Sequence, residues 1–406
     1  MIKRSLFVIL LMLVTVPRAA HAVQCDQVTT PSPLGTIIYA QVGDTQNNLM
    51  RRLSRALRDN TNNKITLVWT TSGSCTNINA IYNGVAIATT VNMSYAPSVA
   101  DNATWDPANA NDAPLTCTVP AGTIPDIANS ALFNSACNPA TPPASVFLNF
   151  GPVQAYVMAV PEASTQTAIT FEEAYFVFGF GTNGQVAPWT DELSMYIRTI
   201  TKSTLLAWAA NISVPGDKWK GVRRDSSPEV VADLQGATAN AEKAIGILGA
   251  EVYDGLRSTL NVLAFRAKGQ YAAYYPDSTF TARDKKNVRD GHYTVWSPTV
   301  WMDKVDGNGD PVKPNTRYIT DLIAGKTVTP VTNFSMIDII AAVGLVPDCA
   351  MRVKRGFEGG PLSLYQPTES CVCKYESLVD TSSCATCDTT TSCATGTCRN
   401  GYCEVQ

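Results

Sequence analysis

The sequence contains almost no histidine. His21 and His292 are the two histidines among 406 residues, and we expect His21 to be removed with an export leader. Nucleophilic catalysis by Ser–His–Asp or Cys–His pairs needs an imidazole as the base. One remaining histidine offers little for such a pair, and we interpret His292 as structural. We therefore expect no enzyme of that kind.

Paired carboxylates are another possible basis for catalysis. Asp277 with Asp284 and Glu172 with Glu173 lie close enough in sequence to suggest the two carboxyl groups that glycoside hydrolysis needs. Solvated surfaces often carry such pairs, and Glu173 has another role because Thr170 and Glu173 form the pattern of a helix capping box. We therefore predict no catalytic residue and no cofactor.

Basic charge is not in excess. The chain has 31 Lys and Arg against 34 Asp and Glu, a formal net charge of −3. Lys3, Arg4 and Arg18 belong to the expected leader, so the mature chain is more acidic still. A nucleic-acid-binding protein would be basic, which argues against that class. A small anion is still an acceptable ligand, because local backbone donors can outweigh the net charge.

Long apolar runs are missing after the N-terminus. Residues 6–16 form an apolar stretch behind Lys3 and Arg4 that is too short for a stable membrane anchor, and Ala20-His21-Ala22 is a small-residue cleavage pattern. We predict a signal peptide over residues 1–22. The mature protein would begin near Val23, without a transmembrane span, and would be periplasmic or secreted.

Cysteine is plentiful, and every cysteine lies in the mature part. Export places the chain in an oxidising compartment, and the cysteines fall into an early group of four and a late group of eight, so we predict disulfides. Four cysteines allow three pairings and eight allow about 105, which leaves the connectivity open. Zinc held by the late group is the alternative. The candidates are Cys25, Cys75, Cys117, Cys137, Cys349, Cys371, Cys373, Cys384, Cys387, Cys393, Cys398 and Cys403.

The first part of the mature chain alternates strands and helices. We predict a strand over residues 36–39, a helix opened by Gly43-Asp44-Thr45 with Leu49, Leu53 and Leu57 on its buried face, and a second strand over 65–69. This order favours a parallel α/β sheet. Further elements are predicted as strands at 153–160, 244–248 and within 284–301, and as helices from Thr170, from Ser203 or Thr204, and over 337–343.

A loop rich in hydroxyl groups and glycine follows the second strand. It contains Ser72, Gly73 and Ser74 and leads into a helix predicted from Asn77 to Gly84. Helix N-termini carry unpaired N–H groups and a partial positive charge, so this loop suits phosphate or a similar oxyanion. An ordinary helix with a hydroxyl cap is the alternative.

Taken in order, several short motifs resemble the phosphate-binding proteins of ABC importers, within the type 2 periplasmic binding proteins. More narrowly, the chain is similar to a myxobacterial-type branch with disulfides and a Cys-rich tail. The motifs span about residues 36–345. They are Gly43-Asp44-Thr45, Thr71-Ser72-Gly73-Ser74-Cys75-Thr76, Asp126-Ile127-Ala128-Asn129-Ser130, Arg198 with Lys202-Ser203-Thr204, Ala244-Ile245-Gly246-Ile247-Leu248, and the stretch from Lys286 to Trp296.

The resemblance implies a two-lobed α/β fold with ligand held in the cleft between the lobes and with a small Cys-rich C-terminal module. Lobe one would comprise residues 23–155 and 292–348, lobe two 156–291, and the Cys-rich tail 349–406. A small phosphate-like oxyanion would be the ligand and an ABC permease the membrane partner. The implied ligand-binding residues are Gly43, Asp44, Thr45, Ser72, Gly73, Ser74, Asp126, Ser130, Arg198, Ser203 and Thr204.

The sequence departs from that family at three positions. First, the family has a carboxylate after the Ser of its Asp-Ile-x-x-Ser motif, and this chain has Ala131 there, which leaves Asp126 as a substitute. Second, Lys202 stands where a glycine is expected. Third, Asp44 adds a negative charge to the first loop. The alternative is therefore a structural, adhesive or interaction protein built on the same fold with a decayed ligand site.

A calcium site is a further alternative, suggested by Asp306-Gly307-Asn308-Gly309-Asp310. An EF-hand loop needs Gly at its sixth position and Glu at its twelfth, and Pro311 and Arg317 stand there. We predict a turn, because Asp-Gly and Asn-Gly pairs favour positive φ.

Overall fold

A computed structural model describes residues 23–137, 141–380, 382–388 and 393–405 of the chain. The predicted signal peptide lies outside these residues. Within them, no helix has the length and the hydropathy that crossing a bilayer would require.

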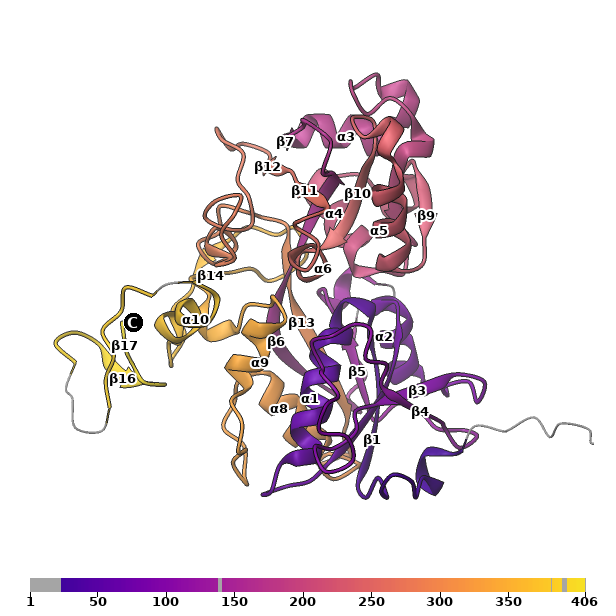
Figure 1. Cartoon of the computed structure of the whole chain (residues 1–406), viewed down its shortest axis with the longest axis vertical. Helices are drawn as coiled ribbons and strands as arrows, with labels where there is room; N and C mark the ends of the chain where they lie inside the picture. Colours follow the sequence, from indigo (N-terminus) through magenta and orange to yellow (C-terminus); the bar gives the residue numbers. More distant parts are fainter. Residues whose placement is uncertain (1–22, 138–140, 381, 389–392, 406) are drawn as a thin grey trace, which may run out of the picture.

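One large mixed sheet runs through both halves of the molecule (Figure 1). β1 pairs in parallel with β2 and β5, as the sequence predicted for this part of the chain. β13 and β6 lie antiparallel in the middle of the sheet. Its strands, in pairing order, are β4 (Leu115–Thr118), β3 (Asn92–Tyr95), β2 (Thr66–Ser72), β1 (Ile37–Gly43), β5 (Ile127–Ser130), β13 (Trp296–Lys304), β6 (Val146–Pro161), β10 (Ile245–Gly249), β8 (Met195–Arg198) and β9 (Val222–Arg224), with β11 (Leu260–Val262) also on β6.

The long strand β6 joins the two lobes. Its first part pairs with β13 from Val146 to Ala155, and its last part pairs with β10 and β11 from Tyr156 to Pro161. β13 pairs with β5 in lobe one as well as with β6. Two strands, β6 and β13, thus cross between the lobes, and the chain has a two-lobed α/β architecture. The boundaries at 155/156, 291/292 and 348/349 stay a prediction.

Lobe one packs helices against its end of the sheet. Leu49, Leu53 and Leu57 of α1 (Asn47–Asp59) are fully buried in one core cluster, as their four-residue spacing predicted. α8 (Thr316–Ile323) and α9 (Met336–Ala342) join that cluster, and α2 (Ser74–Asn83) contributes to another with β5.

The irregular segment between β3 and β4 is organised by one arginine of α1. Arg51 is buried, and its guanidinium donates to the carbonyls of Pro107, Asn109 and Asp112 at 3.0, 2.7 and 2.8 Å. The same guanidinium lies over the ring of Trp105. The backbone oxygens of a loop without regular structure are thereby satisfied from one side chain.

Lobe two has its own large core around β10 and the end of β6. The predicted capping box is confirmed, since Thr170 accepts from the amide of Glu173 and Glu173 accepts from the amide of Thr170 at the start of α3. The helices of this lobe are α3 (Phe171–Phe180), α4 (Ser203–Ile212), α5 (Ser227–Gly236), α6 (Ala250–Asp254) and α7 (Lys286–Arg289), and a small sheet pairs β7 (Ala168–Thr170) with β12 (Ala264–Arg266).

All twelve cysteines form disulfides. The predicted cysteines of the early group pair as Cys25–Cys117 and Cys75–Cys137. The cysteines of the late group pair with partners close in sequence, 10 to 22 positions away. The pairs are Cys349–Cys371, Cys373–Cys384, Cys387–Cys398 and Cys393–Cys403.

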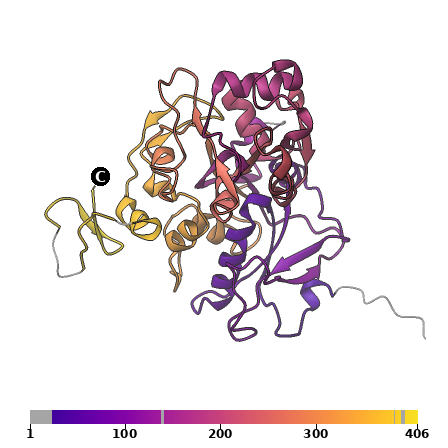
Figure 2. The same ribbon diagram turned by 45° about the horizontal axis from the view of Figure 1, so that its top comes forward.

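The C-terminal segment is held in two different ways. Its last part, the hairpin of β16 (Thr397–Arg399) and β17 (Tyr402–Glu404), stands away from the two lobes in both views (Figures 1 and 2). Its first part packs on them, because Tyr375 of α10 (Val372–Val379) is fully buried in the core cluster of lobe two. The sequence predicted a small Cys-rich module over residues 349–406; α10 of this segment shares the core of lobe two.

We predict that Tyr375→Ala lowers the free energy of unfolding by about 3–5 kcal/mol, the usual cost of truncating a buried aromatic ring. Tyr375→Phe should have little effect, since the buried Tyr375 hydroxyl has no hydrogen-bond partner among the described residues. Denaturant unfolding of both variants measures this. Leu364→Ala is the control, as Leu364 is 92% exposed. An effect of Tyr375→Ala as small as that of the control would show that α10 is not part of the core.

Candidate anion site between the lobes

Three helical N-termini meet where the lobes face each other. The short helix η2 (Asp44–Gln46) leads into α1 directly after β1, and α2 follows β2 after a single residue, Gly73. α4 supplies the third from lobe two. None of the three has a side-chain cap. The amides of a first helical turn have no partner within the helix, so these termini are suited to bind an anion.

α2 begins earlier than predicted. The helix starts at Ser74 and not at Asn77, and the hydroxyl residues Thr70, Thr71 and Ser72 continue β2. Ser72 pairs with Gly43 across the parallel strands, which brings the first two loops together. The predicted end at Gly84 is confirmed, with φ of +65°.

The two lobes touch directly at this place. The amide of Cys75 in lobe one donates to the carbonyl of Thr201 in lobe two at 3.2 Å. A Cβ atom on Gly73 would lie 2.7 Å from the same carbonyl oxygen. Glycine is required at position 73 because the backbone of the opposite lobe leaves no room for a side chain.

Arg198 and Asp44 form an ion pair across the cleft. Nη2 of Arg198 lies 2.6 Å from Oδ2 of Asp44, and the arginine side chain is completely buried. Arg198 also donates to the carbonyls of Arg224 and Asp225 and to Oγ of Ser227. The guanidinium predicted to bind the ligand is thus held by lobe two and paired with a carboxylate of lobe one.

The hydroxyl groups predicted to bind the ligand differ in whether they already form hydrogen bonds within the protein. Oγ of Ser74 accepts from the amide of Ala131, and Oγ of Ser130 donates to the carbonyl of Leu132, so both are engaged. Ser203 bonds the hydroxyl of Tyr156, a group whose pKa is raised by burial. Oγ1 of Thr204 is buried and has no partner among the described residues. Thr204 at the start of α4 therefore offers an unused donor and acceptor.

Three further residues that were predicted to bind the ligand, Gly43, Thr45 and Ser72, lie in lobe one. Gly43 donates its amide to the side chain of Asn129 at 3.4 Å, and the hydroxyl of the buried Thr45 accepts from Gln46. Ser72 is half-buried beside them. These residues surround the lobe-one side of the cleft.

Asp126 does not reach the cleft, and its suggested role as a substitute carboxylate is wrong. It precedes β5, at the strand end opposite to the helix N-termini. Its carboxylate accepts from the amide of Tyr39 at 2.8 Å and from the ammonium of Lys313 at 2.6 Å. The carboxylate that the structure does bring into the cleft is that of Asp44.

Two groups in the cleft were not predicted as ligand-binding residues. The ammonium of Lys202, at the N-terminus of α4, forms no hydrogen bond or ion pair with the described residues, and burial lowers its pKa against the opposing effect of Asp44. Glu251 of α6 is buried, and burial raises its pKa to about 8. Glu251 is therefore protonated and uncharged at neutral pH. The charges of Arg198 and Asp44 cancel, so Lys202 adds one positive charge to this group of side chains.

Glu251 belongs to a chain of polar side chains that crosses the hinge. Gln46 of lobe one donates to Gln154 of β6 at 3.0 Å, and Gln154 donates to Oε2 of Glu251 in lobe two. The only sequence feature that marks Glu251 is its position two residues after Gly249, which is too common a pattern to predict a functional residue.

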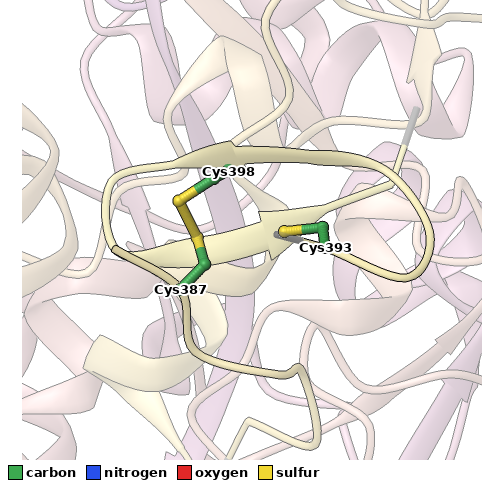
Figure 3. Close-up of side chains that lie close together, drawn as sticks. All are labelled: Cys387, Cys393 and Cys398. Carbon is green, nitrogen blue, oxygen red and sulfur yellow. A yellow bond between two sulfur atoms is a disulfide. The ribbon is translucent and has the colours of Figure 1, made fainter. Parts of the chain in front are cut away.

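The metal alternatives are not supported by side-chain geometry. Cys387, Cys393 and Cys398 lie within 4.8 Å of one another, and Figure 3 shows the bond between Cys387 and Cys398. Cys393 is bonded to Cys403. Disulfide sulfur lacks the thiolate charge that binds zinc. Asp306 accepts from the amides of Asn308 and Asp310, which confirms the predicted turn.

The sequence matches no protein-family model and no curated protein. The structure does match solved structures. One is a protein from Clostridium perfringens assigned as a phosphate ABC transporter substrate-binding protein, with bound phosphate, at TM-score 0.51 and 10% identity over 77% of this chain and 99% of that one. Another is an ABC-type phosphate transport receptor from Vibrio cholerae, at TM-score 0.47 and 12% identity over 76% and 99%.

The first of these matches shows the fold. The chain has the two-lobed α/β fold of a periplasmic binding protein, with disulfides in its C-terminal part, as the sequence predicted. The predicted myxobacterial-type branch stays a prediction.

We predict that Gly73→Ala separates the lobes, because the new methyl group meets the carbonyl of Thr201 and such overpacking costs about 1–3 kcal/mol. Small-angle X-ray scattering should show a larger radius of gyration. Gly236→Ala is the control, since nothing lies within 4 Å of a Cβ there. Unchanged scattering and stability for Gly73→Ala would mean that the lobes do not touch here in solution.

Glu251 should make stability depend on pH. Its folded pKa of about 8 lies above the ordinary 4.5, so the folded state holds the proton longer than the unfolded state. Stability is then greatest below pH 4.5 and falls as the pH rises towards 8. Glu251→Gln removes this loss, which is at most about 4–5 kcal/mol.

The measurement is the difference in unfolding free energy between Glu251→Gln and the original protein at pH 5 and at pH 8.5. The variant should gain relative stability at the higher pH. An equal difference at both values would contradict the raised pKa.

Proposed function

We propose that this protein is an exported solute-binding protein that captures phosphate or a similar tetrahedral oxyanion between its lobes. The observation that carries the proposal is the meeting of three uncapped helical N-termini with Arg198 and Lys202. Backbone amides with a guanidinium and an ammonium are the donors that an oxyanion requires. Six disulfides favour an oxidising, extracytoplasmic location.

The ligand has to share the cleft with Asp44. The carboxylate of Asp44 is itself an oxyanion placed on Arg198, so a tetrahedral anion can replace it there only if the side chain of Asp44 turns aside. A carboxylate next to the ligand then accepts a hydrogen bond from a protonated oxygen. Hydrogen phosphate and hydrogen arsenate carry such an oxygen at neutral pH, whereas sulfate does not. Asp44 would thus serve in place of the carboxylate that Ala131 removes.

The partner would be a membrane importer. The resemblance to the phosphate-binding proteins of ABC importers, together with the fold, supports an ABC permease that receives the ligand from the closed protein. No enzymatic step is part of this proposal.

A second candidate function is an interaction protein that no longer binds a small ligand. It is favoured by one observation, that Arg198 is already satisfied by Asp44 and three groups of lobe two. In this case the closed cleft would be permanent and the projecting Cys-rich hairpin would carry the activity.

We predict that phosphate and arsenate stabilise the protein against thermal unfolding and that sulfate does so far less. Phosphate at 100 times its Kd should add about 2.7 kcal/mol. Arg198→Ala should abolish the effect. Asp44→Asn should remove the preference against sulfate, because the amide can donate to a fully ionised oxyanion. Differential scanning fluorimetry and calorimetric titration check these results.

Asp217→Asn is the control, because Asp217 is exposed and pairs only with the neighbouring Lys218. The proposal fails if neither the original protein nor Asp44→Asn responds to phosphate, arsenate, sulfate or molybdate. That result would favour the second candidate function.

A further inference from the structure

A cavity lies where both lobes meet the C-terminal segment. We call it the junction cavity. Its volume is about 310 Å³, which is in the range of small-molecule sites. It is lined by Arg52 of α1, Glu251 and Asp254 of α6, Arg283, and Leu378 and Val379 of α10.

The wall formed by α10 is fixed to both lobes. Glu376 lies 2.8 Å from the guanidinium of Arg289 in lobe two, and Lys374 lies 3.0 Å from Asp338 of α9, which belongs to the core of lobe one. α10 and α9 lie beside each other in Figure 1. The cavity is therefore bounded by three parts of the fold whose positions are set by ion pairs and by the buried ring of Tyr375.

The acidic side chains of the junction cavity contribute little net charge. The two oxygens of Asp254 bind Arg257 at 2.5 Å and Lys285 at 2.8 Å. Asp277 balances the second of these cations by contacting Lys285 at 3.0 Å. Glu251 is protonated at neutral pH, as argued above, and its Oε1 is buried without a partner among the described residues.

The basic side chains, in contrast, are not neutralised. Arg52 comes from lobe one and Arg283 from the part of the chain that leads to α7. In the described parts of the chain, no hydrogen bond or ion pair is formed by either guanidinium. Two unpaired arginines facing one cavity favour a ligand with two negative charges, because guanidinium groups bind carboxylate or phosphate through paired hydrogen bonds.

We propose that the junction cavity binds a small organic dianion, whose acidic groups pair with Arg52 and Arg283 and whose carbon chain packs against Leu378 and Val379. The proposal does not depend on the function proposed for the interlobe anion site, with which the junction cavity shares the side chain of Glu251. Since Arg52 and Arg283 lie on different lobes, a ligand bound by both stabilises the closed arrangement.

The test is calorimetric titration of the full mature protein with succinate, glutarate and glycerol 3-phosphate. Butane-1,4-diol, a neutral analogue of succinate, is the ligand control. We expect at least one dianion to bind with one-to-one stoichiometry and the diol not to bind. Arg52→Ala and Arg283→Ala should each weaken binding about tenfold, the effect of losing one charge-assisted hydrogen bond.

Two variants decide where a dianion binds. Lys243→Ala removes an exposed lysine far from the cavity in sequence and should leave the Kd unchanged. The double variant Arg52→Ala/Arg283→Ala should lose binding. The inference is overturned if no dianion binds, or if the double variant keeps the original Kd. Binding of phosphate to the interlobe site would be unaffected by either outcome.

Discussion

The cleft depends on one constraint, which is that the buried guanidinium of Arg198 requires an anion. A charge taken out of water without a partner costs several kcal/mol, so a fully buried arginine next to the lobe interface has to be paired in every state of the protein. In this structure Asp44 of the opposite lobe supplies the negative charge at 2.6 Å. The contact between the lobes at this point is therefore an ion pair, and in the proposed function an oxyanion ligand would have to replace the carboxylate of Asp44.

That constraint explains the other contacts at the interface. Lobe closure brings the amide of Cys75 to the carbonyl of Thr201 and requires glycine at position 73. It also brings the carboxyl group of Glu251 into a dry environment that keeps it protonated. The interlobe cleft therefore favours negative charge. It is surrounded by helix N-termini, by the ammonium of Lys202, which is unpaired among the described residues, and by the uncharged Glu251.

The C-terminal segment adds a second constraint on the lobes. α10 is tied to lobe two by Arg289 and Tyr375 and to lobe one by Asp338. Opening the cleft has to change at least one of these contacts or move α9 together with α10. The Cys-rich part is thus more than an appendage, because its first helix, α10, forms ion pairs with both lobes.

The local features of the fold were readable from the chain. The spacing of Leu49, Leu53 and Leu57, the capping box of Thr170 and Glu173, and the turn at Asp306 depend on neighbours within a few residues, and the structure has all three. The start of α2 was misplaced by three residues because Ser and Thr are equally suited to the end of a strand and to a helix cap. The neighbouring strand decides between them.

The sequence by itself determined that the chain is acidic and cysteine-rich, alternates strands with helices, and carries anion-type loops in a recognisable order. Only the tertiary structure decided which charges meet. It placed Asp126 beside Lys313 and Asp44 against Arg198, paired the twelve cysteines, and brought Lys202 and Glu251 into the cleft. The reason is physical: helix and strand propensities act between near neighbours, whereas the ion pairs of Asp44 and Asp126 join residues 154 and 187 positions apart and the disulfides join cysteines up to 92 positions apart.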